Sequence, residues 1–185
     1  MPLGSAEALA LAGMMGSGKS TVAGWLGRWL RRPVVSTDAR VEALARKSVA
    51  RIFAEDGEPA FRALERRVVG ELRGPLVVDL GGGAFCDGHS AARLLRVARV
   101  IFLDVSETEA ARRLGAARPD GREMAARPLA PRWGELRQRR LPLYRRAPVR
   151  VETDGRSPEA VARLVHDLVT RPRRRPGGDL QGGLG

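Results

Sequence analysis

The sequence predicts a three-layer α/β domain in which a five-stranded parallel sheet carries helices on both faces. Short apolar runs alternate along the chain with segments of helical periodicity, as they do where parallel strands are joined by crossover helices. The length of 185 residues and the hydrophobic content of 43% suit one domain with one buried core. The strands are expected at residues 7–12, 33–36, 75–80, 98–104 and 148–152.

Start signals mark several of the helices that alternate with these strands. Asp38 and Ser106 stand where helix N-caps belong, because a short polar side chain there accepts a hydrogen bond from the first turn. Ser157 precedes Pro158, which places a proline in the first position of the last helix. The helices are expected near residues 19–31, 38–46, 48–54, 58–73, 88–96, 106–117, 132–146 and 157–170.

Two segments depart from this alternation. Residues 118–131 hold three prolines and three arginines between two predicted helices, a composition expected of a flap that folds over bound phosphates; an ordinary exposed loop is the alternative. Residues 171–185 are rich in Arg, Pro and Gly and hold too few apolar side chains to pack, so we expect this tail to be disordered. The domain is therefore expected to cover residues 1–170, with a helical region around 38–70.

A glycine-rich loop follows the first predicted strand and fits the phosphate-binding pattern G-x-x-x-x-G-K-[ST] at every fixed position. Its glycines let successive backbone N–H groups surround phosphate oxygens, while Lys19 reaches the β and γ phosphates and Ser20 offers a hydroxyl to Mg²⁺. Of the 33 basic side chains only Lys19 and Lys47 are lysines, so the chain places a compact charge where a phosphate needs one. The loop predicts binding of a nucleoside triphosphate through Gly13, Gly16, Ser17, Gly18, Lys19, Ser20 and Thr21.

The net charge of +12 raises the question of a nucleic-acid partner. The arginines are spread through every segment and no aromatic side chains alternate with them, so we expect no specific binding of nucleic acid. No stretch approaches the roughly 18 consecutive apolar residues of a membrane span, and the N-terminus lacks the features of a leader. The single Cys86 cannot form an internal disulfide, as is typical of a reducing compartment. We expect a cytoplasmic monomer without a membrane partner.

Polar side chains and glycines end the second and third predicted strands. Asp79 ends an apolar strand, which is the usual setting of a Mg²⁺-supporting acid near a phosphate loop. The triple glycine 81–83 directly after it lets a ligand approach the backbone closely. Asp38 follows the neighbouring strand at the same edge of the sheet, where it either caps a helix or points at an acceptor hydroxyl. Since the chain has no room for an effector domain, these features favour a small-molecule phosphotransferase.

Taken in order, the motifs resemble those of the shikimate kinase family over nearly the whole chain to about residue 170. Many enzymes share the nucleotide loop, but Gly-Glu-x-x-Phe-Arg-x-x-Glu from Gly57 and Arg-x-Pro-Leu-Tyr from Arg140 are far more specific. Arg127-Pro128-Leu129 within the 118–131 segment matches as well. The resemblance implies a P-loop kinase-like fold with a lid. It also implies phosphorylation of the 3-hydroxyl of shikimate by ATP with Mg²⁺, a step toward chorismate and the aromatic amino acids.

The resemblance implies roles for individual residues. Asp38 matches the carboxylate that holds the acceptor hydroxyls and can take the proton, and Arg127 matches the lid arginine that reaches toward the transferring phosphate; with Lys19 they form the implied catalytic set. Arg156 and Pro158 lie where the adenine-contacting loop of the family falls. The implied shikimate contacts, in which the two arginines grip the carboxylate, are Asp38, Arg62, Gly81, Gly82, Gly83 and Arg140.

One position departs from the family pattern. The family usually ends its second strand with Asp-x-Asp, whose first carboxylate supports Mg²⁺ through water, whereas this chain has Ser36 there. On the third strand, where the family commonly has a small residue, this chain carries Asp79. We therefore hypothesise that the carboxylate lies on the neighbouring strand end and that Ser20 and Asp79 form the metal site. A divergent or weakened enzyme is the competing interpretation.

Two other functions fit parts of the pattern. A kinase for another small polyol acid, such as gluconate, would share the nucleotide loop, but the paired Arg62 and Arg140 and the triple glycine argue against it. A nucleotide-binding homologue with weak or no catalysis, in contact with nucleic acid through its basic surface, is favoured only by Ser36. Nucleotide binding without shikimate-dependent turnover would identify that homologue.

Overall fold

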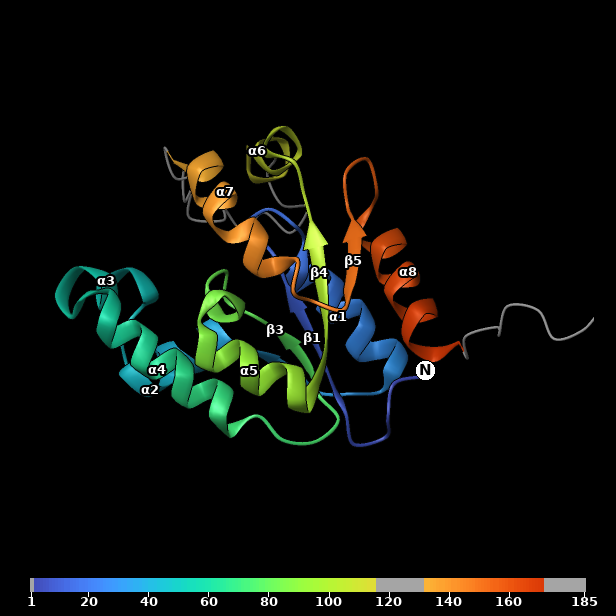
Figure 1. The fold of residues 1–185 in the computed structure, drawn as a ribbon, viewed down its shortest axis with the longest axis horizontal. Helices are drawn as coiled ribbons and strands as arrows, with labels where there is room; N and C mark the ends of the chain where they lie inside the picture. The colour runs from blue at the N-terminus through green and yellow to red at the C-terminus, as the bar shows by residue number, and fades with distance from the viewer. Residues whose placement is uncertain (1, 116–131, 172–185) are drawn as a thin grey trace, which may run out of the picture.

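The computed structural model describes residues 2–115 and 132–171, which form a five-stranded sheet with helices on both faces (Figure 1). The strands are β1 Ala8–Ala12, β2 Val34–Ser36, β3 Val77–Asp79, β4 Ala98–Asp104 and β5 Val149–Glu152. Their order is β2-β3-β1-β4-β5, and each pairing between neighbours is parallel. The predicted α/β architecture is confirmed, and the strands nearly coincide with their predicted ranges.

The helices also lie close to their predicted positions. They are α1 Lys19–Leu30, α2 Thr37–Ala45, α3 Val49–Glu55, α4 Gly57–Glu71, α5 Gly88–Val97, α6 Glu107–Gly115, α7 Trp133–Tyr144 and α8 Pro158–Thr170, with a 3₁₀ turn η1 Ala84–Cys86. Within the described parts of the chain, no helix is both long and apolar enough to cross a lipid bilayer.

Two of the three predicted helix starts are confirmed. The Ser106 and Ser157 hydroxyls accept backbone hydrogen bonds at 3.2 Å from the first turns of α6 and α8. The predicted cap at Asp38 is wrong, because Ser36 caps α2 by accepting a hydrogen bond from the Ala39 N–H at 3.3 Å. Ser36 is the last extended residue of β2, which is the conformation that a cap requires. Asp38 therefore lies in the first turn of α2.

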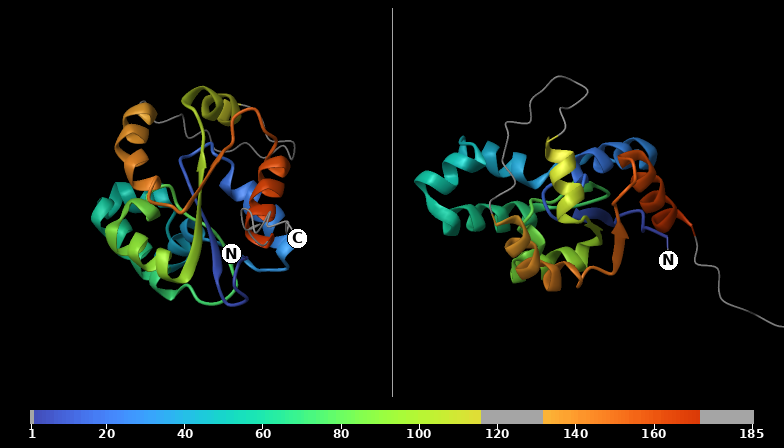
Figure 2. Two further views of the ribbon diagram at one scale, coloured as in Figure 1. Left: turned by 45° about the vertical axis from the view of Figure 1, so that its right-hand side comes forward. Right: turned by 90° about the horizontal axis from the view of Figure 1, so that it is seen from above.

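Alternate residues of the sheet face two different cores. Leu9 and Leu11 of β1 face the side covered by α1 and α8, whereas Ala10 and Ala12 face the side covered by α4, α5 and α7 (Figures 1 and 2). Helices α2, α3 and α4 pack against one another at one end of the molecule (Figure 2). The cluster that joins them holds Val41, Val49, Ile52, Phe61 and Val68.

The carboxyl ends of β1, β2 and β3 meet at one edge of the sheet. Asp79, the last residue of β3, is in register with Ser36 of β2 and with Leu11 of β1. After β1 the chain forms β2 and β3 on one side of β1, and then β4 and β5 on its other side. The direction in which strands are added to the sheet therefore reverses beside β1. Ligands of open parallel sheets bind at such a reversal, outside the carboxyl ends of the strands.

Candidate active site

The phosphate loop, residues 13–18, connects β1 to α1. Gly16 and Gly18 have φ values of 87° and 89°, a conformation that residues with side chains rarely adopt. A Cβ on Gly16 would also lie 2.9 Å from the Ala110 Cα, and a Cβ on Gly13 would lie 2.9 Å from the Ser17 Oγ. Only glycines therefore allow this path from β1 into α1, a path on which backbone N–H groups can bind phosphate oxygens. The resulting cradle fits the phosphates of a nucleotide.

Lys19 is the first residue of α1, and its ammonium group lies against the phosphate loop. Its Nζ donates to the carbonyl oxygens of Gly13 at 3.0 Å and Met14 at 3.1 Å. Burial lowers the pKa of Lys19, and the negative charges of Asp79 and Asp38 act in the opposite direction. The structure thus brings the lysine, the loop and the two predicted acidic residues to one place.

Ser20 and Asp79 are in direct contact. The Ser20 Oγ donates a hydrogen bond to the Asp79 Oδ2 at 2.6 Å, although the two residues lie on different elements. Mg²⁺ prefers oxygen ligands and is usually held by one or two protein groups together with water and phosphate oxygens. A hydroxyl and a carboxylate beside the phosphate loop are such a donor set, so these residues fit the metal that the nucleotide brings.

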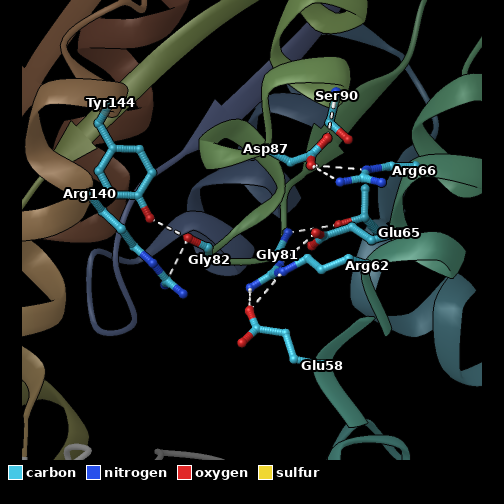
Figure 3. A network of polar contacts seen from close by, with 11 residues as sticks. Glu58, Arg62, Glu65, Arg66, Gly81, Gly82, Asp87, Ser90, Arg140 and Tyr144 are labelled. Atoms are coloured by element: carbon cyan, nitrogen blue, oxygen red, sulfur yellow. Dashed lines mark hydrogen bonds and ion pairs between the residues drawn. The ribbon is translucent and has the colours of Figure 1, made fainter. Parts of the chain in front are cut away.

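The triple glycine 81–83 forms a turn after β3 against which three charged side chains lie. Figure 3 shows two of them, Arg62 and Arg140. A Cβ on the first glycine would collide with the Asp38 carboxylate, and a Cβ on the third would collide with the Arg62 guanidinium. A Cβ on the second would lie 3.4 Å from the Arg140 Nη1. The absence of side chains on this turn is therefore what lets Asp38, Arg62 and Arg140 come together.

Two glutamates of α4 hold the Arg62 side chain. Its Nη1 pairs with the Glu65 Oε2 at 2.7 Å and its Nη2 with the Glu58 Oε1 at 2.9 Å. Glu65 is only 1% exposed, and this burial raises its pKa, while Arg62 lowers it. Glu65 is not among the predicted site residues, although it lies three residues after Arg62, a spacing that places both on one helix face. Glu65 orients the guanidinium at the glycine turn.

Helix α7 approaches the glycine turn from the other side (Figure 3). The Arg140 Nη1 donates to the Gly82 carbonyl oxygen at 3.0 Å, and the Tyr144 hydroxyl donates to the same oxygen. The Tyr144 ring stacks on Phe102 of β4 at a centroid distance of 4.9 Å, which fixes the end of α7 on the sheet. Arg62 and Arg140 therefore flank one small surface with two forked cations, an arrangement suited to a carboxylate.

Arg113 of α6 connects the phosphate loop with the loop after β5. Its Nη1 donates to the Gly16 carbonyl oxygen at 3.2 Å, and its Nη2 donates to the Thr153 carbonyl oxygen at 2.5 Å. The Arg156 carbonyl lies 3.5 Å from the same Nη2. Arg156 and Pro158, the residues expected near the adenine, are exposed in this region, beside the phosphate loop. Arg113 is not among the predicted site residues.

The predicted lid 118–131 and the predicted catalytic residue Arg127 lie outside the described residues. The other predicted site residues fall along one edge of the sheet in three adjoining parts. These parts are the phosphate loop with Lys19, Ser20, Thr21 and Asp79, the glycine turn with Asp38, Arg62 and Arg140, and the loop with Arg156 and Pro158.

Three comparisons relate the chain to known proteins. A family model described as "Shikimate kinase" matches residues 15–170. The shikimate kinases of Rhodococcus jostii and Thermobifida fusca are 40% and 42% identical over 166 and 160 residues, which cover 87% and 84% of this chain and 95% and 90% of the relatives. The solved structure of the shikimate kinase from Acinetobacter baumannii in complex with shikimate is similar with a TM-score of 0.78 and 28% identity, over 88% of this chain and 92% of that one.

Proposed function

Since the chain belongs to the shikimate kinase family, we propose how its residues divide the transfer of a phosphoryl group from ATP to shikimate. The chain is an ATP- and Mg²⁺-dependent kinase of shikimate in the biosynthesis of aromatic amino acids. The observation that carries the assignment of the acceptor site is the convergence of Asp38, Arg62 and Arg140 on one glycine turn, next to the phosphate loop.

The acceptor side of the site binds an acid that also carries hydroxyl groups. Arg62 and Arg140 present two guanidinium groups, and each can form paired hydrogen bonds with a planar carboxylate. The Asp38 carboxylate, from α2, lies against the same glycine turn and within electrostatic reach of Lys19. Its carboxylate accepts a hydrogen bond from the 3-hydroxyl of shikimate, orients that oxygen toward the γ-phosphorus and takes its proton. The backbone of Gly82 and Gly83 contacts the remaining ring hydroxyls.

The donor side of the site holds the phosphates of ATP. The backbone N–H groups of the phosphate loop surround them, and the Lys19 ammonium stabilises the charge that spreads over the γ-phosphoryl oxygens in the transition state. Ser20 and Asp79 are the residues that would hold Mg²⁺, which supplies positive charge against the phosphate oxygens. Arg113 and the loop that carries Arg156 border the place for the base. For Arg127 we propose the role that the family motif implies, which is to reach toward the transferring phosphate.

All groups assigned to the described part of the site come from a single chain. We therefore propose that the enzyme acts as a monomer. Because the arginines of the site are occupied in binding a carboxylate and a nucleotide, we also propose that its positive charge serves these small anions and no nucleic acid. The expected place of action is the cytoplasm, where ATP is available.

An acceptor panel tests the proposed function. Release of ADP from MgATP is measured with shikimate, with gluconate and without an acceptor, by the wild type and by Lys19→Met. We expect turnover by the wild type with shikimate to exceed turnover with gluconate by at least about 100-fold, because gluconate lacks the ring that the glycine turn accommodates. Equal rates with the two acids, or ADP release that does not depend on an acceptor, would contradict the proposal.

A further inference from the structure

Helix α7 makes a second contact, with the phosphate loop itself. Trp133, the first residue of α7, is 2% exposed, and its indole N–H donates to the Met15 carbonyl oxygen at 3.2 Å. Met15 is the third residue of the nucleotide-binding motif that begins at Gly13. A buried tryptophan normally satisfies its N–H. Here the partner that satisfies it belongs to the loop that binds the phosphates.

The geometry of the peptide bond gives this contact a consequence. In a planar trans peptide, the C=O of one residue and the N–H of the next point in opposite directions. The Met15 C=O points toward Trp133, so the Gly16 N–H points away from α7 and toward the inside of the loop. The N–H groups on the inside of such a loop are the ones that bind phosphate oxygens. The indole of Trp133 thus sets the direction of one of these donors.

The surroundings of Trp133 hold the indole in place. Its ring lies in the same buried cluster as Met14 of the loop and Ala110 of α6. Ala110 also packs directly against Gly16, where no Cβ would fit. The next carbonyl of the loop, that of Gly16, accepts a hydrogen bond from Arg113 at 3.2 Å. Two successive peptides of the loop are therefore held from outside it by side chains of α6 and α7.

We propose that Trp133 is a positioning residue for the nucleotide, which holds the Gly16 N–H toward the phosphate oxygens of ATP. The inference rests on the proposed function only in that the loop binds the phosphates of ATP. Helix α7 makes a similar contact on the acceptor side of the site, where Arg140 and Tyr144 donate hydrogen bonds to the Gly82 carbonyl oxygen. One helix thus orients a peptide in each half of the site.

The variant Trp133→Phe tests this role because it keeps an aromatic ring and removes the N–H donor. The dissociation constant of MgADP, measured by calorimetry without shikimate, is expected to rise about threefold to tenfold, the effect of one lost hydrogen bond. The KM for MgATP rises by a similar factor, while the KM for shikimate stays unchanged. The melting temperature falls slightly, because the hydrogen bond is also present without the nucleotide. Trp29→Phe is the matched control, because Trp29 contacts Trp25 and His166 on the α1 and α8 side of the sheet.

The NMR signals of the indole N–H groups in the wild type test the role of Trp133 without depending on whether Trp133→Phe folds. The chain has three tryptophans, so Trp25→Phe and Trp29→Phe assign the Trp133 signal by elimination. We expect the Trp133 proton to exchange slowly with solvent and its signal to shift on addition of MgADP, unlike that of Trp29. Unchanged MgADP affinity in Trp133→Phe, or a Trp133 signal that MgADP leaves in place, would overturn the inference. Wild type that binds MgADP without phosphorylating shikimate would refute the proposed function alone.

Discussion

The Ser20 hydroxyl donates a hydrogen bond to the Asp79 carboxylate at 2.6 Å, which connects the start of α1 to the end of β3. The register partner of Asp79 on β2 is Ser36, the position at which the family pattern usually has a carboxylate. The two positions are therefore next to each other at the same edge of the sheet. This adjacency supports the hypothesis that Asp79 supplies from β3 the negative charge that Ser36 does not supply from β2.

Removal of the Asp79 carboxylate is expected to make the enzyme dependent on high Mg²⁺. Asp79→Ala loses activity by at least about tenfold at limiting Mg²⁺ and by much less at saturating Mg²⁺, because added metal compensates for a weakened site. ADP release measured across a Mg²⁺ titration checks this. The double variant Ser36→Asp with Asp79→Ser moves the carboxylate back to β2 and is expected to restore the wild-type Mg²⁺ dependence, since Asp also caps a helix well. Equal loss at all Mg²⁺ concentrations would contradict the role.

The third glycine of the turn, Gly83, is expected to be required for the binding of shikimate but not for the binding of MgATP. Gly83 has a φ of −108°, which alanine adopts readily, but the added Cβ would collide with the Arg62 guanidinium. Gly83→Ala therefore raises the KM for shikimate about tenfold or more and leaves the KM for MgATP unchanged. Gly88→Ala is the control, because nothing lies within 4 Å of its added Cβ. A rise of both KM values in Gly83→Ala would instead indicate a general distortion.

The contact between Arg66 and Asp87 makes stability depend on pH. The hydrogen bond from Arg66 lowers the pKa of Asp87 from 3.8 to about 2. A carboxylate with a lowered pKa stabilises the fold above its ordinary pKa, and this contribution disappears as the pH falls through the folded value. Arg66→Ala is expected to lower the unfolding free energy at neutral pH by a small amount, because the pair is exposed to solvent on the Arg66 side.

Urea unfolding of wild type and Arg66→Ala at several pH values tests this contribution. The difference between the two proteins is expected to shrink as the pH falls from about 4 through about 2, because Asp87 of the folded wild type takes up its proton around pH 2. Arg67→Ala is the control, since Arg67 is exposed and pairs only at the helix surface with Glu71. A difference that stays constant over this range would contradict the assignment of the pH dependence to Asp87.

Asp104, at the end of β4, is expected to contribute more to the unfolding free energy than Glu152, at the end of β5. It is 5% exposed and accepts from the Arg137 Nη2 at 2.8 Å and the Arg150 Nε at 2.9 Å, which links α7 and β5 to β4. Asp104→Ala is expected to cost about 3 kcal/mol of unfolding free energy, because it removes a buried carboxylate that two partly exposed arginines contact. Glu152→Ala, which removes a 73% exposed partner of Arg150, is expected to cost at most about 0.5 kcal/mol. Equal losses in urea unfolding would contradict this difference.

The strands, the helices and the phosphate loop were predictable because their signals are local in the sequence. Apolar runs, helical periodicity and the motif from Gly13 to Ser20 each extend over a few residues. The start of α2 was not predictable to the residue. Ser36 and Asp38 are equally good caps, and only the point at which the chain leaves β2 in an extended conformation decides between them.

The site residues that the sequence does not predict act through contacts between distant segments. Arg113 lies four residues after Glu109, a spacing typical of a helix-surface pair, and only the folded chain brings it to Gly16. The indole of Trp133 reaches Met15 in the same way, across most of the sequence. Periodicity describes which face of a helix is buried, but it does not identify the group that the buried side chain meets.

Loss of the Arg62 guanidinium is the change that tests the central assignment most directly. Shikimate-dependent ADP release is measured for the wild type, Arg62→Ala and Arg67→Ala, which removes an exposed arginine from the same helix. The acceptor site described above predicts a fall of about 100-fold in kcat/KM for shikimate in Arg62→Ala, about 3 kcal/mol. It predicts unchanged MgADP affinity in that variant and wild-type values in Arg67→Ala. Equal kcat/KM for shikimate in the two variants would contradict the assignment of the glycine turn as the acceptor site.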